Sequence, residues 1–349
     1  NAQGKGDRME RMSEGKVFVQ TNAAHNEVIA FARASDGSLT RIGAYSTGGA
    51  GDDTAHLTSQ GSVTLTRDRR HLLVTNVASG DVSVFALGDG QVELTLTKTV
   101  PVGPAPKSVA EHDGLVYVLA TGDATIHGFR LVDGDLVPVD GGVRSLSTPD
   151  GAQIGFTPDG RALIATERGA DKLSAFAVGM DGMLGEPRTI ASQGATPYGF
   201  AISNDGALVV TEAFGAQEGA ASASSYRVDG DEITPKTASV GNGRSEICWA
   251  VIGNDGRFAF TTNFADGAVS RYRIGMDGSL TLEDATAGVT EDGRVGLRDE
   301  DLSDDGRFLY AIDTDQGEIA GWAVGGDGSL SKLGPWGGLP TTVAGLAAI

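Results

Sequence analysis

The sequence is poor in features that mark several large classes of protein. Its 349 residues include one cysteine, Cys248, so an internal disulfide and a metal site built from several cysteines are both excluded. No apolar run approaches the roughly 18 residues of a membrane-spanning helix. No ten-residue window shows the i, i+3, i+4, i+7 apolar spacing of an amphipathic helix. The lack of helical periodicity excludes doubly wound and barrel α/β folds.

Positive charge is also scarce. Lys and Arg total 27 against 46 Asp and Glu, which gives a net charge of −19 without any run of basic residues. Such a chain repels phosphate backbones and anionic lipid surfaces, so we expect no nucleic-acid partner and no membrane partner. We expect a monomer that acts on a small molecule. The chain starts at Asn1 with a polar segment, which favours a secreted or periplasmic location and leaves the cytoplasm open.

What the sequence has in quantity is an internal repeat. Seven copies of an apolar run, a short turn and a second alternating run follow one another, as in HLLVTNVASGDVSVFAL and RFLYAIDTDQGEIAGWAV. A leading strand closed by an Asp-Gly turn and a fourth strand complete each unit. The spacing between units is roughly 45 to 54 residues, which is typical of four-stranded propeller blades. The residues that end the second strands are Asn22, Asn76, Thr121, Glu167, Glu212, Asn263 and Asp313.

The two ends of the chain are complementary. Residues 16–46 supply only three strands of a blade, whereas the C-terminal TTVAGLAAI is one strand in excess. Pairing of the last strand into the first blade would remove two exposed sheet edges. We therefore predict an all-β fold, a seven-bladed β-propeller with four antiparallel strands per blade, closed by the C-terminal strand. It forms a single domain over 16–349 behind a polar tail at 1–15.

The segments HLLVTN, TPDGRALIATE, SDDGRFLYAID and GDGSLSKLG, with the final GLAAI, resemble the lactonase-family seven-bladed propellers. This group includes propeller 6-phosphogluconolactonases and carboxymuconate-lactonising enzymes, and the resemblance covers residues 16–349. It implies lactone chemistry at one mouth of the central channel. Of four residues used by the muconate-lactonising members only Glu167 is kept. Lys107 stands in place of a His, and Ala152 and Ala213 in place of two Arg.

Two glutamates depart from the repeat. Glu167 and Glu212 end the second strands of adjacent blades, where the usual residue is Asn or Asp. Two converging carboxylates can divide acid and base roles, or hold a divalent cation at the channel mouth, although no cofactor is required. The alternative is that they are surface residues paired with Arg168 and Lys172.

A run of four charges, 298–301, is the second departure. Leading strands of other blades are apolar at the matching positions, and a buried carboxylate is costly unless it is paired or hydrogen-bonded. We expect this strand to line a water-filled channel, with Arg298 pairing one of the acids. In a functional interpretation Arg298 clamps a substrate carboxylate or carbonyl, Glu300 performs acid–base work and Asp301 binds substrate.

The remaining candidates come from loops and strand starts. His56 lies in TGGAGDDTAHLTSQG, an insertion between the first two blades that we expect to fold over the channel mouth, and it is a candidate for proton transfer. Lys107, Tyr198 and Arg168 are candidates for substrate binding. Trp249 is a candidate stacking platform, with core packing as the alternative.

Two functional classes follow. The first is a lactonase-like hydrolase or isomerase that acts on a small lactone or cyclic carboxylic acid at the channel mouth. The second is a non-catalytic propeller that binds a polymer, a protein or a small ligand. Charged residues on channel-lining strands favour the enzyme, whereas the missing family residues favour the binding protein.

Overall fold

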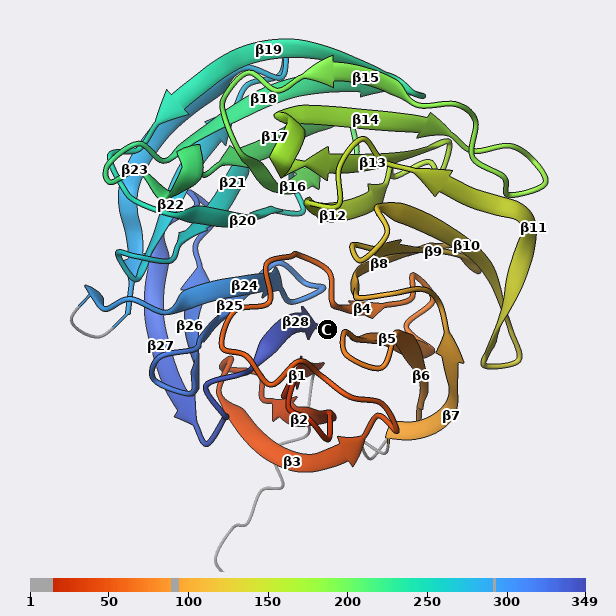
Figure 1. The fold of residues 1–349 in the computed structure, drawn as a ribbon. Helices are drawn as coiled ribbons and strands as arrows, with labels where there is room; N and C mark the ends of the chain where they lie inside the picture. Colours follow the sequence, from red (N-terminus) through yellow and green to blue (C-terminus); the bar gives the residue numbers. More distant parts are fainter. Residues whose placement is uncertain (1–14, 89–93, 291–292) are drawn as a thin grey trace, which may run out of the picture.

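The computed structural model describes residues 15–88, 94–290 and 293–349, which form seven four-stranded antiparallel sheets around a central axis (Figure 1). The predicted seven-bladed propeller is therefore confirmed. Helix among these residues consists of short 3-10 turns, which include η1 (Arg168–Ala170) and η2 (Phe214–Ala216). No described helix is long and apolar enough to cross a membrane. Residues 1–14 of the expected polar tail lie outside the described residues, and the first strand begins at Gly15.

Each blade is numbered by its place along the chain and written from its inner to its outer strand. Blade 1 is β28 (Ala344–Ala348), β1 (Gly15–Gln20), β2 (Glu27–Arg33) and β3 (Leu39–Ser46); blade 2 is β4 (Val63–Leu65), β5 (His71–Asn76), β6 (Asp81–Leu87) and β7 (Leu94–Pro101); blade 3 is β8 (Pro106–His112), β9 (Leu115–Ala120), β10 (Thr125–Val132) and β11 (Asp135–Ser145). Blade 4 is β12 (Gly151–Phe156), β13 (Ala162–Glu167), β14 (Lys172–Ala177) and β15 (Arg188–Ala191); blade 5 is β16 (Pro197–Ile202), β17 (Ala207–Glu212), β18 (Ser222–Asp229) and β19 (Glu232–Gly241). Blade 6 is β20 (Ile247–Ile252), β21 (Phe258–Asn263), β22 (Ala268–Ile274) and β23 (Leu280–Val289); blade 7 is β24 (Leu297–Leu302), β25 (Phe308–Asp313), β26 (Glu318–Val324) and β27 (Leu330–Gly337).

The turn after each inner strand is specified by its own residues. In blade 7 the Ser303 hydroxyl donates to Asp305 and accepts from the backbone N–H of Phe308. Gly306 follows with φ of +69°, a left-handed conformation that glycine adopts without strain. Blade 4 builds the same turn from Thr157 and Asp159. These motifs fix where the inner strands of blades 4 and 7 end.

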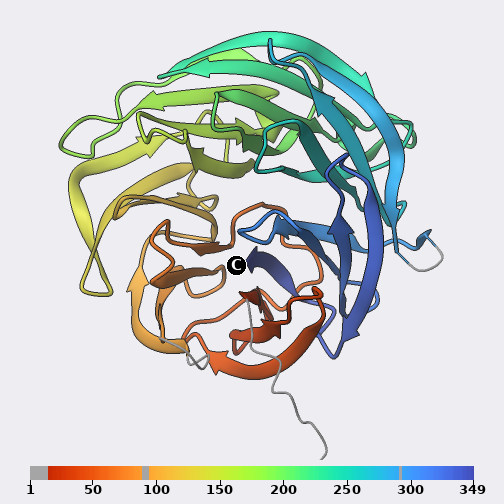
Figure 2. The same cartoon turned by 180° about the vertical axis from the view of Figure 1, so that it is seen from behind.

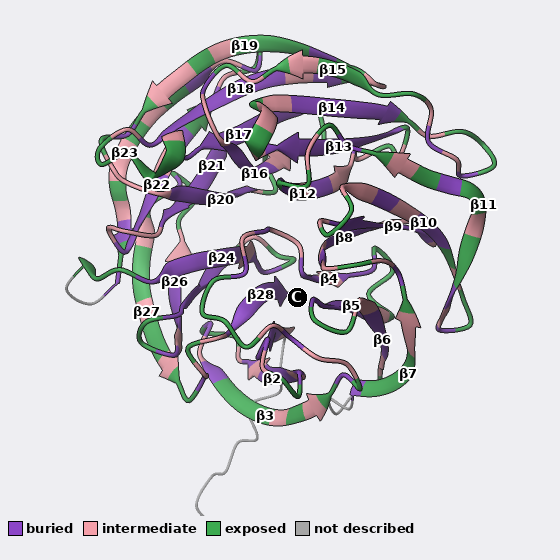
Figure 3. Ribbon diagram, in the orientation of Figure 1, coloured by how far each residue is buried: buried purple, intermediate pink, exposed green. Residues whose placement is uncertain are grey.

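Apolar side chains pack between blades, so the protein has a ring of interfaces in place of one central core. Successive clusters join blades 1 and 2, 2 and 3, and so on to blades 7 and 1. Burial is concentrated in the three inner strands of each blade, and the outermost strands carry most of the exposed residues (Figure 3). Each blade is thus stabilised by both of its neighbours, and the ring is cooperative only if it is closed.

The C-terminal strand closes the ring. β28 pairs antiparallel with β1, as predicted, and the two views of the ribbon show it beside β1 at the inner edge of blade 1 (Figures 1 and 2). Leu346 packs in the cluster shared with blade 7, and Ala347 packs in the cluster shared with blade 2. The last and first strands are further joined by hydrogen bonds between the backbones of Ile349 and Lys16.

Part of the charged run of β24 serves this closure. Asp299 accepts a hydrogen bond of 2.7 Å from the backbone N–H of Gly345, and Asp301 accepts one of 2.9 Å from that of Ala348. Both N–H groups lie on the edge of β28 that faces away from β1, so the two carboxylates satisfy donors that would otherwise be unpaired. Gln153 of blade 4 has the same role toward the next inner strand. Its side-chain amide donates to the carbonyl of Phe200 and accepts from the backbone N–H of Phe200.

Deletion of residues 341–349 is expected to abolish cooperative unfolding, because it opens the ring and exposes the apolar faces of blades 1 and 7. Far-UV circular dichroism during thermal denaturation measures this. A sharp transition at the wild-type temperature would show that closure by β28 does not hold the ring together.

The substitution Asp299→Asn tests the carboxylate at the closure. Burial raises the pKa of Asp299 to about 7 in the folded protein, above its ordinary value of about 4 in an unfolded chain. The folded state thus binds the proton more tightly, and this group's contribution to stability falls as the pH rises from about 4 to about 7. The difference in free energy of unfolding between wild type and Asp299→Asn should change across that window, by on the order of a few kcal/mol. A pH-independent difference would contradict the assignment.

Candidate functional site

The inner strands all begin at one end of the channel, here named the front mouth, and end at the other, the back mouth. The insertion before β4 folds over the front mouth, as predicted, and residues 56–60 of it, here named the plug, cross the channel. The side-chain amide of Gln60 donates to the carbonyl of Ala250 at 2.9 Å and accepts from its N–H, and the backbone N–H of Gln60 donates to Ala152. A segment of blade 2 is thereby attached to blades 4 and 6.

Two further contacts hold the plug. The indole N–H of Trp249 donates to the carbonyl of Ser59 at 2.8 Å, and the Ser59 hydroxyl donates to the carbonyl of Lys107 at 2.6 Å. Trp249 is fully buried. Its ring lies edge-on to Tyr198, within a cluster that includes Cys248. This environment favours the core-packing alternative for Trp249 over a stacking platform for a ligand.

The plug separates cavities at the two mouths. The front cavity has a volume of about 260 Å³, and its lining includes His56, Thr58, Arg168, Tyr198 and Glu246. At the back mouth lie two adjoining cavities of about 320 Å³ and about 380 Å³, which share Gln60, Arg69 and Asp301. Gln60 faces the back and Thr58 the front, so the channel is not continuous along its length.

His56 is held at the front cavity by a cation and an aromatic ring. Its Nδ1 is in hydrogen-bond contact with the Arg298 guanidinium, and its ring stacks on Phe264 with centroids 5.4 Å apart. Arg298 lies over the same phenyl ring at 4.2 Å. Partial burial, followed by the charges of Arg298, Arg168 and Lys107, lowers the pKa of His56 to about 4. His56 is therefore neutral at physiological pH.

The other cations approach the cavity from different blades. Lys107 lies at the start of β8, and its ammonium group donates to Thr58 of the plug at 3.3 Å. Burial, followed by the charge of the nearby Arg168, lowers the pKa of Lys107. Arg168, in η1, forms an ion pair with Asp150 and lies over the Tyr198 ring at 4.8 Å. Arg298 and Lys107 form no ion pair with any described residue. One cation, Arg168, thus lines the cavity, and Lys107 and Arg298 contact the lining residues Thr58 and His56, in a chain of net charge −19.

Glu246 is a functional candidate that the sequence interpretation missed. It precedes β20 and lines the front cavity, and its partly buried carboxylate has no hydrogen bond or ion pair to a described residue. Burial, and to a smaller extent the charge of Glu246, raise the pKa of Cys248 to about 12, so this cysteine is a neutral thiol. The repeat could have pointed to Glu246, because it occupies the position directly before an inner strand, where blades 4 and 5 also carry the polar residues Asp150 and Thr196.

Glu167 and Glu212 do not form the expected converging pair. Each is buried and bonded to serine hydroxyls: Glu167 to Ser147 and Ser174, and Glu212 to Ser222, Ser224 and Ser239. The described contacts include none between the two carboxylates. In blades 2 and 6 the same repeat position holds Asn76 and Asn263, which bond Ser83 and Ser270 on the third strand. The glutamates make the corresponding bond, which indicates a structural role.

The charged run of β24 is divided between the two mouths. Arg298 contacts His56 and donates to Thr314 at 3.3 Å, so the expectation that it pairs one of its own acids is wrong. Glu300 and Asp301 instead line the cavity at the back mouth. The carboxyl oxygens of Glu300 are buried without a well-formed hydrogen bond among the described residues. Burial, followed by the charge of Asp301, raises the pKa of Glu300 well above its ordinary value.

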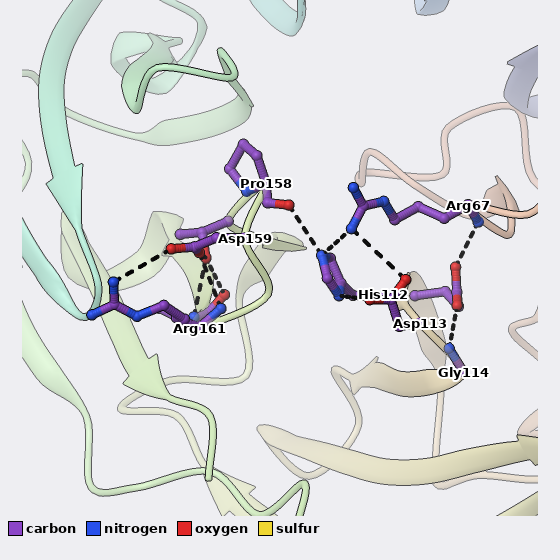
Figure 4. A network of polar contacts seen from close by, with 10 residues as sticks. Arg67, His112, Asp113, Gly114, Pro158, Asp159 and Arg161 are labelled. Carbon is purple, nitrogen blue, oxygen red and sulfur yellow. Dashed lines mark hydrogen bonds and ion pairs between the residues drawn. The ribbon is translucent and has the colours of Figure 1, made fainter. Parts of the chain in front are cut away.

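Turns from several blades are joined at the back mouth. Figure 4 shows the Arg67 side chain pointing to the His112 ring, which also contacts the carbonyl of Pro158 at 3.1 Å. Arg69 spans from blade 2 to Asp304 of blade 7, with a 3.0 Å bond. The described residues contain no group of three or more His, Cys, Asp or Glu arranged to hold a metal ion. The polar contacts at the back mouth therefore join the turns of different blades to one another.

The fold and the plugged channel define the class: a seven-bladed propeller with a small front cavity lined by Arg168, His56 and Glu246. Residues 109–213 match the family model of "Lactonase, 7-bladed beta-propeller", which confirms the resemblance. No curated protein matches the chain.

Solved structures with this fold are similar at low identity. A Bacteroides uniformis protein provisionally named a 6-phosphogluconolactonase is 17% identical with a TM-score of 0.75, over 96% of this chain and 100% of that one. A Bacteroides fragilis protein of the same provisional name is 16% identical, with a TM-score of 0.74 over 100% of both chains. A periplasmic gluconolactonase of Pseudomonas aeruginosa is 18% identical, with a TM-score of 0.73 over 96% of this chain and 99% of that one.

The substitutions Glu212→Ala and Glu212→Gln test the structural role of this glutamate. Alanine leaves the hydroxyls of Ser222 and Ser224 without their acceptor, while that of Ser239 keeps the carbonyl of Gln193. It should lower the free energy of unfolding by about 1–3 kcal/mol. Glutamine keeps one acceptor and should leave any turnover within a few-fold of wild type. Denaturant unfolding and initial rates measure the two effects. A loss of turnover above 100-fold in a stable Glu212→Gln protein would instead make Glu212 catalytic.

Proposed function

We propose that the protein is a lactone hydrolase whose site is the front cavity. The observation that carries the proposal is that Arg168 and His56 line one small cavity, while Arg298 contacts His56 and Lys107 donates to Thr58 of the same lining. Hydrolysis of a lactone develops negative charge on the carbonyl oxygen, and fixed cations and N–H donors in a site of low polarity stabilise that charge. Arg168 and His56 are such groups in the lining of the cavity.

The size and lining of the cavity limit the substrate. A volume of about 260 Å³ lies just below the ~300–1,000 Å³ of most ligand sites. Tyr198, Ala213 and Cys248 provide apolar lining, and His56, Thr58, Arg168 and Glu246 provide polar lining. A small cyclic ester fits this arrangement, and a carboxylate or other anionic substituent on its ring would interact favourably with Arg168 and Lys107.

The comparisons support the same reaction class. The family model carries the name of lactonases, two of the similar propellers carry the provisional name 6-phosphogluconolactonase, and a third is named a periplasmic gluconolactonase. The specific substrate is a matter for the assay, because identities below 20% define the fold alone. A periplasmic or secreted location remains part of this proposal, as do a monomeric state and activity without a metal cofactor.

A non-catalytic binding protein is the second candidate. Ala152 and Ala213 occupy places where muconate-lactonising propellers are expected to use arginine, and both are buried beside Trp249. The cavity would then retain a small anion without converting it. Binding of a hydroxy acid without turnover of any lactone would identify this case.

A lactone panel in a pH-stat tests the proposal. γ- and δ-lactones, sugar lactones with and without phosphate, and muconolactones are each assayed with wild type, Arg168→Met and Lys107→Met. We expect turnover of at least one lactone, with kcat/KM reduced about 10- to 1,000-fold in either variant because a group that stabilises the oxyanion is lost. Arg161→Met is the control, since Arg161 pairs with Asp159 on the exposed surface. Hydrolysis no faster than in buffer for every lactone would refute the proposal.

A further inference from the structure

The residue before each inner strand is positioned at the front mouth by the backbone. Thr196 and Glu246 have φ of +59° and +55°, and their carbonyls accept hydrogen bonds from Ala213 and Phe264. These bonds attach the start of an inner strand to the end of the second strand. Ala105, before β8, has the same conformation with φ of +52°, so in blades 3, 5 and 6 the backbone fixes where the side chain at this position begins. At Glu246 it places a carboxylate at the wall of the front cavity.

The Glu246 carboxylate has the features of a proton acceptor. It has no hydrogen bond or ion pair to a described residue, in contrast to Asp150, which is paired with Arg168. A partly buried carboxylate that remains open to the cavity can bind and orient a water molecule. The other buried glutamates near this end are occupied, since Glu167 and Glu212 are bonded to serines. Cys248 is a neutral thiol, which leaves Glu246 as the available acceptor.

His56 has the opposite role because of Arg298. A guanidinium group only donates hydrogen bonds, so the contact between Arg298 and Nδ1 requires that Nδ1 carry the lone pair. A neutral imidazole then carries its proton on Nε2. The charged groups that face His56 are Arg298 from β24, Arg168 from η1 and Lys107 from β8, and all three disfavour an imidazolium. His56 is thereby fixed as a hydrogen-bond donor to the cavity.

We propose that Glu246 is the general base of the front cavity and that His56, held by Arg298 as its Nε2–H tautomer, donates to the carbonyl oxygen of the lactone. The inference rests on the proposed function and assigns its roles. Arg298 is then a positioning residue that acts through His56.

The proposed step balances without a further reactant. Glu246 takes a proton from water as the water oxygen bonds to the carbonyl carbon, and the carbonyl π electrons move to the oxygen that His56 hydrogen-bonds. When the carbonyl re-forms, the bond from the acyl carbon to the ring oxygen breaks. The ring oxygen takes the proton from Glu246 and becomes a hydroxyl group. One lactone and one water give one hydroxy acid, which releases its acidic proton to solvent.

Glu246→Gln tests the base on the lactone that wild type hydrolyses best. We expect kcat to fall about 100- to 10,000-fold, as for loss of a general base, with KM changed by less than five-fold. Glu218→Gln is the matched control, because Glu218 is exposed on the loop after η2. A Glu246→Gln enzyme within three-fold of wild-type kcat overturns the assignment while leaving the lactonase proposal intact. Failure of wild type to hydrolyse any lactone overturns both.

The role of His56 has a test that does not depend on turnover. In ¹⁵N NMR of histidine-labelled protein we expect the His56 signals of the neutral Nε2–H tautomer, unchanged between pH 5 and pH 8. In Arg298→Lys or Arg298→Met the ring should titrate closer to the ordinary histidine value of about 6.5 and lose the fixed tautomer. The pH profile of kcat/KM should gain the same titration. A protonated His56 at pH 6 in wild type, or the Nδ1–H tautomer, would overturn the assignment.

Discussion

Closure of the ring by β28 is the constraint on which the rest of the structure depends. The apolar surface is divided among seven interfaces between blades, and each blade needs both neighbours. β28 completes blade 1, contributes to the interfaces on both sides of it, and receives Asp299 and Asp301 of β24 along its free edge. Because the partners of both carboxylates are backbone N–H groups of β28, these hydrogen bonds exist only when the C-terminal strand is in place. The channel exists only in the closed ring.

The closed ring in turn permits the plug. Gln60 and Ser59 belong to the segment before blade 2, yet their partners are Ala250, Trp249 and Lys107. These partners surround the channel only when all blades are assembled. The plug blocks the passage, so one channel becomes separate cavities with different chemistry. The front cavity is lined by Arg168, His56 and Glu246, and the back cavity is lined by the acids of β24. The division also explains why neighbouring residues such as Arg298 and Glu300 belong to different sites.

Sequence reasoning predicted the architecture better than the site. The blade count, the Asp-Gly turns and the pairing of the last strand followed from a periodic pattern, because each repeat records the same local preferences. His56 and its loop followed from an insertion that interrupts that pattern. The prediction for Glu167 and Glu212 was wrong, because their departure from the repeat was interpreted as a sign of function. Each glutamate in fact makes the hydrogen bond to a serine of the third strand that asparagine makes in other blades. Glu246 escaped notice because its significance lies in the absence of a partner, and a partner is a matter of three-dimensional contact.

A crystal structure with the hydroxy acid product of a hydrolysed lactone tests the central claim most directly, since it locates the ligand without relying on turnover. The account predicts electron density in the front cavity, with a carboxylate oxygen of the product within hydrogen-bond distance of His56 Nε2 and Glu246 on the opposite side. Density confined to the back cavity, beside Asp301 and Arg69, would contradict the assignment of the front cavity as the functional site.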